Sequence, residues 1–197
     1  MSKIITVSRE FGSGGRTIAK RVAEKLGIAC YDQEIIDKIA KESGFCEEFI
    51  REKGEYANTG SRFFNALSAG YANGLSLQDR LWIEQERIIT ELASKGECVI
   101  VGRCADVILR DKAQCLKVFI HADMQKRMER IVNVYGETEQ PTERRLKDKD
   151  KRRKAYYQYY TDTAWGDVNN YHLCLDSGAL GIDSCVELIV SAYNKLG

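Results

Sequence analysis

The residues best suited to bind phosphate lie in one short stretch, GSGGRT, from Gly12 to Thr17. Consecutive glycines let backbone N–H groups turn toward an anion, and the N-terminus of a following helix adds a favourable dipole. The hydroxyl of Thr17 could bind Mg²⁺, and the forked guanidinium of Arg16 could contact phosphate oxygens. The usual phosphate-loop pattern is G-x-x-x-x-G-K-[ST], but here Arg16 replaces the lysine and Glu10 replaces the first glycine. A working cradle, a degraded one and a plain glycine turn are therefore all open interpretations.

A second candidate is Arg103, which follows the apolar run ECVIV and a glycine in the stretch VGRCAD. A charged side chain at the end of a buried strand must either reach solvent or meet an anion. We expect an anion, with a structural salt bridge to a nearby carboxylate as the alternative. Asp106 in the same stretch could assist Mg²⁺, but a helix cap or an ion pair is the commoner role for such a residue.

A third candidate is the basic run from Glu137 to Lys154. Its basic residues are Arg144, Arg145, Lys147, Lys149, Lys151, Arg152, Arg153 and Lys154, and its acidic ones are Glu137, Glu139, Glu143, Asp148 and Asp150. Such a run is most often a solvated helix face or a mobile loop. Its position after the fourth predicted strand also suits a lid whose arginines close on a transferring phosphate. RNA binding, suggested by the aromatic residues of KAYYQYY, has no support from the overall charge.

The elements that must position these residues alternate between strand-like and helix-like patterns. After the β-rich run KIITVS, the apolar residues Ile18, Val22 and Leu26 recur at helical spacing. Apolar runs predict strands at 3–8, 28–32, 97–101, 115–123 and 171–176. Helical spacing predicts helices at 16–26, 33–44, 77–96, 124–136 and 181–197, with Ser76 as the N-cap of the third. The segment 45–74 is irregular and broken by glycines.

Strands that are apolar on both faces and separated by helices predict a parallel sheet covered on both sides. Ligands bind such sheets at the carboxyl ends of the strands. The informative loops therefore follow Ser8, Tyr31, Val101, Ile120 and Leu175. The glycine stretch and Arg103 both belong to this set of loops.

The bulk composition fits a single globular domain, because 197 residues with 44% apolar and 30% charged side chains can bury a sizeable core. A net charge of +1 gives no global field that would recruit nucleic acid or a membrane surface. The chain has no apolar run of the ~20 residues that span a bilayer and no signal-like N-terminus, so we expect a cytoplasmic protein. Its seven cysteines include no C-x-x-C pair and are expected to be reduced, mostly buried thiols rather than metal ligands.

The ordered segments SREFGSGGRTIAKRVAEKLG, YDQEII, VIVGRCADVIL, DKRRKAYYQYYT and YHLCLD resemble the P-loop nucleoside monophosphate kinases, and more closely the bacterial cytidylate kinase-like proteins. The resemblance covers nearly the whole chain. It implies a three-layer α/β P-loop fold with a five-stranded parallel sheet of order 2-3-1-4-5 and a helical lid. It also implies one domain over 1–197, with a helical acceptor-binding insertion at 33–96 and a basic lid at 135–156.

For the donor side, the resemblance implies that a loop cradles the triphosphate of ATP and that Thr17 also holds Mg²⁺. The loop residues are Gly12, Ser13, Gly14, Gly15, Arg16 and Thr17. Two arginines on the helix before the lid, Arg127 and Arg130, are expected to face the donor. These assignments make ATP and Mg²⁺ the implied cofactors.

For the acceptor side, the resemblance implies that Asp32 and Gln33 open the acceptor-binding segment and that Arg103 contacts the acceptor's phosphate. Asp150 and Arg153 match the D-x-x-R pattern of the lid, where they would act at the transferring phosphate together with Arg16 and Arg103. The alternative for Asp150 and Arg153 is a surface ion pair between residues three positions apart on a helix.

The chain departs from the cytidylate kinase pattern at four places. Besides the missing lysine, Cys104 stands where an aspartate helps to read cytosine, Leu146 replaces a lid arginine, and Gln33 replaces a small hydroxyl residue. Arg145 or Lys147 could take over from the lid arginine. The departures leave the P-loop fold unaffected but put the acceptor's identity in question.

The implied activity is transfer of the γ-phosphoryl of ATP to a nucleoside monophosphate, with a cytidylate-type acceptor as the first expectation. It would depend on positioning and charge neutralisation rather than covalent catalysis. Two alternatives remain open: a kinase of the same fold for another small acceptor, and a non-catalytic nucleotide sensor. The expected partners are small nucleotides rather than nucleic acid or a membrane, and a homo-oligomer is left open.

Overall fold

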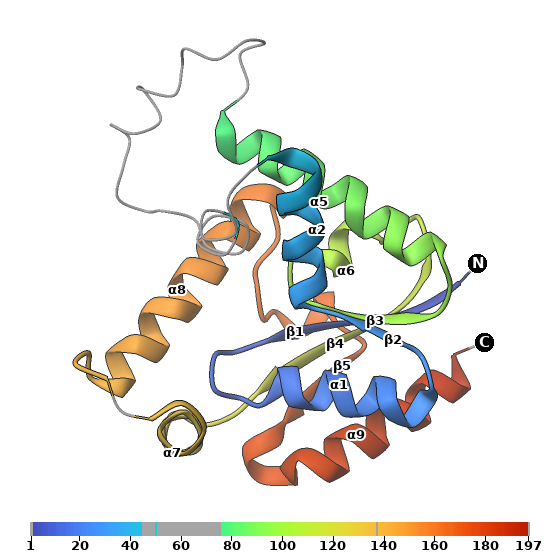
Figure 1. Cartoon of the computed structure of the whole chain (residues 1–197). Coiled ribbons are helices and arrows are strands. Elements are labelled where there is room, and N and C mark those ends of the chain that lie inside the picture. The colour runs from blue at the N-terminus through green and yellow to red at the C-terminus, as the bar shows by residue number, and fades with distance from the viewer. Residues whose placement is uncertain (1, 45–49, 51–75, 137, 197) are drawn as a thin grey trace.

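The computed structural model describes residues 2–44, 50, 76–136 and 138–196. Most of the irregular segment 45–74, and with it the middle of the predicted acceptor-binding insertion, lies outside the described residues. The described part of the chain forms a five-stranded parallel sheet ordered β2-β3-β1-β4-β5 (Figure 1). The strands are β1 Lys3–Arg9, β2 Ala29–Tyr31, β3 Cys98–Val101, β4 Gln114–His121 and β5 Leu173–Asp176. The predicted α/β class and the predicted strand order are both confirmed.

Helices cover both faces of the sheet, which gives three layers (Figure 1). They are α1 Gly15–Leu26, α2 Gln33–Ser43, α5 Leu77–Ser94, α6 Ala105–Ile108, α7 Met124–Tyr135, α8 Thr142–Thr161 and α9 Ser177–Lys195, with a 3₁₀ turn at Val168–Asn170. One face packs against α1 and α9, and the other against α2, α5 and α6. None of the helices in the described residues is long and apolar enough to cross a membrane.

The alternation of side chains along β1 explains why its sequence is almost continuously apolar. Ile5 and Val7 enter the core beneath α1 and α9, whereas Ile4 enters the core beneath α2 and α5. Successive residues of a strand point to opposite faces, so a central strand with both faces covered needs apolar residues at every position. This burial fixes the register that brings the carboxyl ends of the strands together.

Local capping places the ends of the helices. Ser76 caps α5 as predicted, and its hydroxyl accepts a hydrogen bond from the Asp79 N–H. The last helix, predicted to begin at Gly181, begins instead at Ser177, because the Asp176 carboxylate caps it by accepting from two backbone N–H groups. Gly181 has φ +77° and interrupts the helix with a kink, which explains why the helical pattern was only evident after it.

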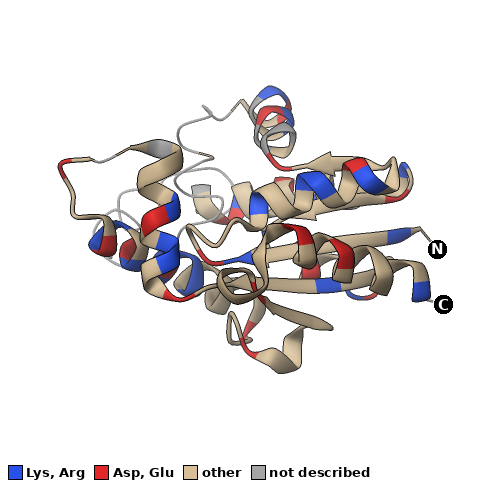
Figure 2. Cartoon of the chain, turned by 90° about the horizontal axis from the view of Figure 1, so that it is seen from below, with Lys and Arg blue, Asp and Glu red and all other residues tan. Residues whose placement is uncertain are grey.

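The basic run mostly forms one helix, α8, which begins after Pro141. The predicted lid, 135–156, spans the end of α7, the connection and most of α8, while the helix continues to Thr161. Figures 1 and 2 show α8 at the end of the molecule opposite the two termini, with basic and acidic residues intermingled along it. α8 packs against α7, next to the carboxyl ends of β1 and β4.

Candidate active site

The glycine loop connects β1 to α1 and is shaped by residues that tolerate no side chain. Gly12 and Gly14 have φ angles of +86° and +79°, a region that favours glycine. A Cβ at Gly14 would lie 2.7 Å from Ile182, and one at Gly15 would lie 2.5 Å from the Cβ of Arg9. The first turn of α1 thus follows a tightly folded loop at the end of a central strand, which is the geometry of an anion cradle.

Two arginines lie at this loop in different environments. The Arg130 guanidinium donates a 2.9 Å hydrogen bond to the hydroxyl of Thr17 and also lies next to Gly14. Arg16, whose side chain is half exposed, instead forms an ion pair with Asp32 after β2. The Arg16–Asp32 pair connects the glycine loop to the predicted acceptor segment. In this structure Arg130, rather than Arg16, is the cation beside Thr17.

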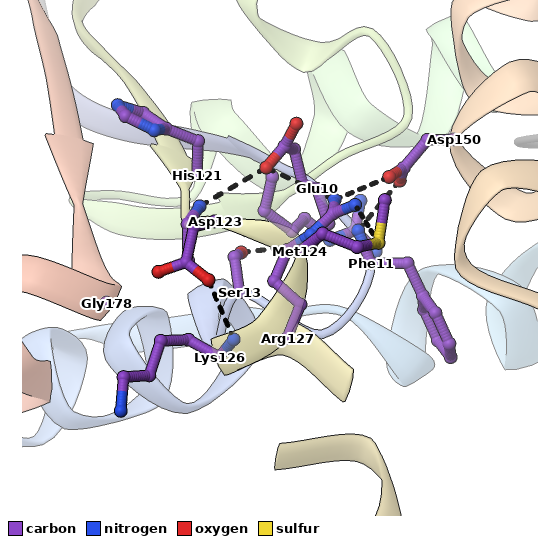
Figure 3. A network of polar contacts seen from close by, with 12 residues as sticks. Glu10, Phe11, Ser13, His121, Asp123, Met124, Lys126, Arg127, Asp150 and Gly178 are labelled. Atoms are coloured by element: carbon purple, nitrogen blue, oxygen red, sulfur yellow. Dashed lines mark hydrogen bonds and ion pairs between the residues drawn. The ribbon is translucent and has the colours of Figure 1, made fainter. Parts of the chain in front are cut away.

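A cluster of ionised side chains ties α8 to the glycine loop (Figure 3). One oxygen of the Asp150 carboxylate accepts from the Phe11 N–H at 2.8 Å, and the other lies 2.6 Å from Nη1 of Arg127. The same Arg127 nitrogen lies 3.1 Å from Oε2 of Glu10. Arg127 is only 4% exposed, so two carboxylates neutralise a buried guanidinium at this point.

Glu10 has a structural role here that its place in the sequence does not suggest. Burial raises the pKa of Glu10, while the neighbouring Arg127 and the Ala122 N–H, which donates at 3.2 Å, act in the opposite direction. The residue at the first-glycine position therefore links the end of β4 to α7 instead of approaching phosphate. The sequence marked Glu10 only as a departure from the usual loop.

A small pocket lies beside the glycine loop, at the carboxyl ends of β1 and β3. It is lined by Ser8, Arg9, Gly102, Arg103, Cys104, Arg153, Tyr156, Tyr157 and Trp165. Three of these side chains are guanidinium groups. The cavity of about 20 Å³ has room for roughly one water molecule, so a larger ligand can enter only if α8 or the lining side chains move.

Arg103 is held in this pocket by neutral groups. It is 5% exposed and has φ +58°, and its Nη1 donates to the Ile50 carbonyl at 3.1 Å and to Oε1 of Gln85 at 3.5 Å. The Gln85 amide in turn donates to the Arg103 carbonyl at 3.1 Å and to the hydroxyl of Tyr156 at 3.3 Å. The carboxylate expected under the salt-bridge alternative is not among these partners in the described residues. A buried cation with neutral partners favours a bound anion.

Residues 4–179 match the cytidylate kinase-like family. The chain belongs to this family. It is 30% identical over 195 residues to the cytidylate kinase of Archaeoglobus fulgidus, covering 95% of this chain and 93% of that protein. It is 28% identical over 190 residues to the cytidylate kinase of Aeropyrum pernix, and the match covers 94% of this chain and 96% of that protein.

The solved structures similar to this chain agree with the family's fold. An uncharacterized protein from Eubacterium ventriosum is 28% identical, with a TM-score of 0.74 over 97% of this chain and 98% of that one. Shikimate kinase from Acinetobacter baumannii, in complex with shikimate, has a TM-score of 0.55 and is 14% identical. The match covers 99% of this chain and 94% of that one, and at this identity it shows the fold alone. Membership of the cytidylate kinase-like family supports a phosphotransferase activity that uses ATP.

The residues that depart from the family pattern occupy defined places in the structure. Cys104, in place of the cytosine-reading aspartate, has φ +54° and packs in a cluster with Tyr156 and Tyr157. Leu146, in place of the lid arginine, is fully buried. Its neighbour Arg145 lies over the ring of Phe11, with 5.7 Å from Cζ to the centroid, whereas Lys147 pairs with Glu143 on the exposed face of α8. Arg145 is thus the better-placed substitute of the two.

Asp106 is neither a cap nor part of an ion pair in the described residues. It is buried in α6, and the hydroxyl of Tyr157 donates to its Oδ2 at 2.6 Å. Burial raises the pKa of Asp106, and the hydrogen bond from Tyr157 partly opposes the increase. This bond attaches α8 to α6. The role with Mg²⁺ stays a prediction.

The structure brings most of the predicted site residues to one edge of the sheet. Arg103 and Arg153 line the pocket, Asp150 and Arg127 form one ion pair, and Arg130 contacts Thr17. Asp32 lies against Arg16, while the side chain of Gln33 lies outside the described residues. Sequence reasoning missed Phe11 and Gln85. For Gln85, the available signal was a polar residue at a position where the helical pattern predicts an apolar one. For Phe11, the sequence offered no signal.

Six cysteines lie in the described part of the chain, and none of them forms a disulfide there. Cys98, Cys104 and Cys185 are buried, as expected, whereas Cys30, Cys115 and Cys174 are only half-buried. Burial raises the pKa of the Cys98 thiol to about 12 and that of Cys115 to about 11. These two thiols are therefore protonated near neutral pH.

Proposed function

We propose that this protein transfers the γ-phosphoryl of ATP to a nucleoside monophosphate, with cytidine monophosphate as the first candidate acceptor. The observation that carries the proposal is that two candidate anion-binding features lie next to each other. The glycine loop follows β1, and the pocket of Arg103 and Arg153 adjoins it at the ends of β1 and β3. A donor phosphate chain in the loop would therefore face an acceptor phosphate in the pocket.

On the donor side, backbone N–H groups of Gly12–Thr17 would hold the phosphate chain, and Arg127 and Arg130 would approach it from α7. The loop fits such a group because Gly14 and Gly15 have no room for a Cβ. Thr17 would be the protein ligand of Mg²⁺, since magnesium in nucleotide sites takes one or two protein oxygens together with phosphate oxygens. When bound, Mg²⁺ supplies charge neutralisation at the phosphates. Arg130 would have to leave the Thr17 hydroxyl first.

On the acceptor side, Arg103 would bind the acceptor's phosphate and Arg153 would stabilise the charge of the transferring group. Both side chains are buried, and their donors are aimed by the backbone: Nη1 of Arg153 donates to the Arg9 carbonyl at 3.1 Å. Asp32 and Gln33 would contribute to the acceptor-binding segment. Asp150 would position the lid through Phe11 and Arg127, and Arg16 would turn from Asp32 to the phosphates. Fixed cations act strongly in a site that excludes water.

One observation favours a second candidate, a kinase of the same fold for another small acceptor. Cys104 packs against Tyr156 and Tyr157 where the cytidylate kinase pattern has an aspartate. A thiol in an aromatic cluster lacks the charged oxygens that would read a cytosine amino group. The acceptor would then carry a phosphate, as nucleotides do, or a carboxylate as the anion that Arg103 binds, and would differ from a nucleotide in the rest of its structure.

The decisive experiment is a panel of acceptors tested with ATP·Mg²⁺, comprising the four ribonucleoside monophosphates, their deoxy forms, shikimate and gluconate. We expect turnover of at least one nucleoside monophosphate, and a loss of roughly 10²–10³-fold in kcat/KM in Arg153→Ala. Arg144→Ala, on the exposed face of the same helix, is the matched control and should retain full activity. Turnover of shikimate or gluconate alone would favour the second candidate.

Thermal unfolding provides an independent test of donor binding and addresses the sensor alternative. ATP at about 100 times its dissociation constant adds about 2.7 kcal/mol, which should raise the midpoint by roughly 5–10 °C for a chain of this size. A shift with ATP but no turnover of any acceptor would indicate a nucleotide sensor. The absence of a shift with every nucleoside triphosphate would contradict both the kinase and the sensor.

A further inference from the structure

Three cations of α8 surround the ring of Phe11 in the glycine loop. Arg145, Lys149 and Arg153 are spaced four residues apart, so they form one stripe along the helix. Their charged groups lie 5.7, 5.9 and 5.8 Å from the ring centroid, within the range of cation–π attraction. One of the three, Arg153, also lines the pocket. The ring of Phe11 therefore lies where the lid's cations meet the loop.

The main chain of Phe11 holds the same helix by a separate contact. Its N–H donates to the Asp150 carboxylate at 2.8 Å. Figure 3 shows the ring pointing away from the cluster of Glu10, Arg127 and Asp150. One loop residue therefore contacts two sides of α8, a carboxylate through its backbone and three cations through its ring.

The chemistry of the ring matters, because a carboxylate in the same place would hold the cations only by neutralising them. The face of a phenyl ring attracts a cation through its quadrupole but carries no net charge. A guanidinium that lies over a ring also keeps its in-plane N–H groups available for phosphate oxygens. The ring offsets part of the mutual repulsion of the three cations without itself neutralising them, while Nη1 of Arg153 also lies 3.9 Å from Oδ1 of Asp150.

We propose that Phe11 is a positioning residue that holds the cation stripe of α8, Arg145, Lys149 and Arg153, over the phosphates during transfer. This inference rests on the proposed function of the same site. The inference adds Phe11, which lies outside the glycine pattern, to the functional residues. It also names the side chain against which the cation stripe packs. The ring does not touch the reacting atoms, so its effect must pass through the three cations.

The test compares Phe11→Leu, which removes the ring, with Phe11→Tyr, which keeps it. The loss of one cation–π contact should lower kcat/KM by about 2- to 5-fold. Because Phe11→Leu loses three such contacts, its kcat/KM should fall by roughly 10-fold or more. Phe11→Tyr keeps the ring, so its kcat/KM should remain within about 3-fold of the wild-type value. The assay uses ATP·Mg²⁺ with the best acceptor of the panel, together with calorimetric binding of ATP. Equal activity of Phe11→Leu and the wild type would overturn the proposal.

A double-mutant cycle separates positioning from general damage to the loop. Phe11→Leu and Arg145→Gln should together cost about 2- to 5-fold less than the product of their single effects, because the ring acts through that cation. Arg144→Gln, at a side chain that is 76% exposed and pairs with Asp148, should show no coupling. Fully multiplicative effects with Arg145 would contradict the proposal. If Phe11→Leu does not fold, the comparison of Arg145→Gln with Arg144→Gln decides the question. Equal activities of these two variants would also contradict the proposal.

The two proposals fail in different ways. If the wild type turns over no acceptor, the proposed function fails, and the Phe11 inference is decided by ATP affinity alone, which should fall in Phe11→Leu and be restored in Phe11→Tyr. If the wild type is active while Phe11→Leu matches it in both affinity and turnover, only the Phe11 inference fails.

Discussion

Two of the buried arginines in the described residues, Arg127 and Arg103, differ in how their charge is balanced. Arg127, between α7 and α8, is neutralised by the carboxylates of Glu10 and Asp150. Arg103, at the end of β3, is held by a backbone carbonyl and the Gln85 amide. A neutralised guanidinium stabilises the connection between elements, whereas one held by neutral oxygens keeps its charge for a ligand. The contrast indicates a donor-side cluster whose charges are already balanced within the protein, and an acceptor-side pocket prepared for an anion.

Removal of the Arg103 guanidinium should have the largest effect on activity. In Arg103→Met, we expect kcat/KM for the acceptor to fall by roughly 10²–10³-fold while the KM for ATP changes little, because the lost donors face the pocket rather than the glycine loop. Steady-state kinetics with each substrate varied in turn would measure this. Equal increases in both KM values would show that the two arginine sites are not functionally distinct.

Removal of the Arg127 guanidinium should have the largest effect on stability. Arg127→Met removes the ion-pair partner that Glu10 has within the described residues and leaves Asp150 with Arg153 at 3.9 Å, and we expect a loss of about 2–4 kcal/mol, or roughly 5–15 °C in the unfolding midpoint. Arg103→Met is the matched comparison and should cost much less, because the partners of Arg103 in the described residues are neutral oxygens rather than carboxylates. Similar losses in the two variants, measured by chemical denaturation, would remove the electrostatic distinction between the sites.

The buried carboxyl group behind the pocket should make stability depend on pH. Burial raises the pKa of Asp106, so the folded state favours its protonated form, and this contribution is lost as the pH rises through the raised pKa. Asp106→Asn keeps an acceptor for Tyr157 without the charge. Its stability relative to the wild type should therefore increase between pH 4 and pH 8, by about 1.4 kcal/mol for each unit of pKa shift. A constant difference across this range would show that Asp106 titrates normally.

The outer face of α8 should show the smallest effect. Lys147→Ala removes a pair with Glu143 that is exposed to solvent, and we expect a loss of about 0.3–0.5 kcal/mol with unchanged turnover. High salt should abolish even this difference, because exposed pairs are screened. A loss of activity as large as that of Arg145→Gln would mean that both faces of the helix, rather than the Phe11 side alone, act on the substrates.

Much of the fold could be predicted because its signals are local. The apolar runs of β1 and β3 indicated a sheet covered on both faces, because such strands need apolar residues at every position. Glycines marked the ends of helices, and each can be recognised from a single residue. The start of the last helix, before the kink at Gly181, could not be predicted from such local signals. The helix begins before it because the Asp176 carboxylate supplies a cap, and that side-chain geometry leaves no periodic pattern in the sequence.

The candidate site could be predicted only for residues that belong to a pattern. The glycine loop, Arg103 and the D-x-x-R of the lid were recognised from motifs and from their places after strands. Their assigned roles stay predictions until the acceptor panel and the variants are tested. Glu10 and Phe11 could not be found in this way, because their importance depends on α7 and α8, more than a hundred positions away in the chain.

The sequence by itself determined the parallel sheet, the glycine loop and the set of charged residues at its carboxyl edge, because strand burial and backbone freedom depend on residue type. Only the tertiary structure decided which charges meet. It paired Arg127 with Glu10 and Asp150, gave Arg103 neutral oxygens as its partners within the described residues, and placed the ring of Phe11 beneath the cations of α8. Coulomb and cation–π energies depend on distances between elements, and only the packing of helices against the sheet sets those distances.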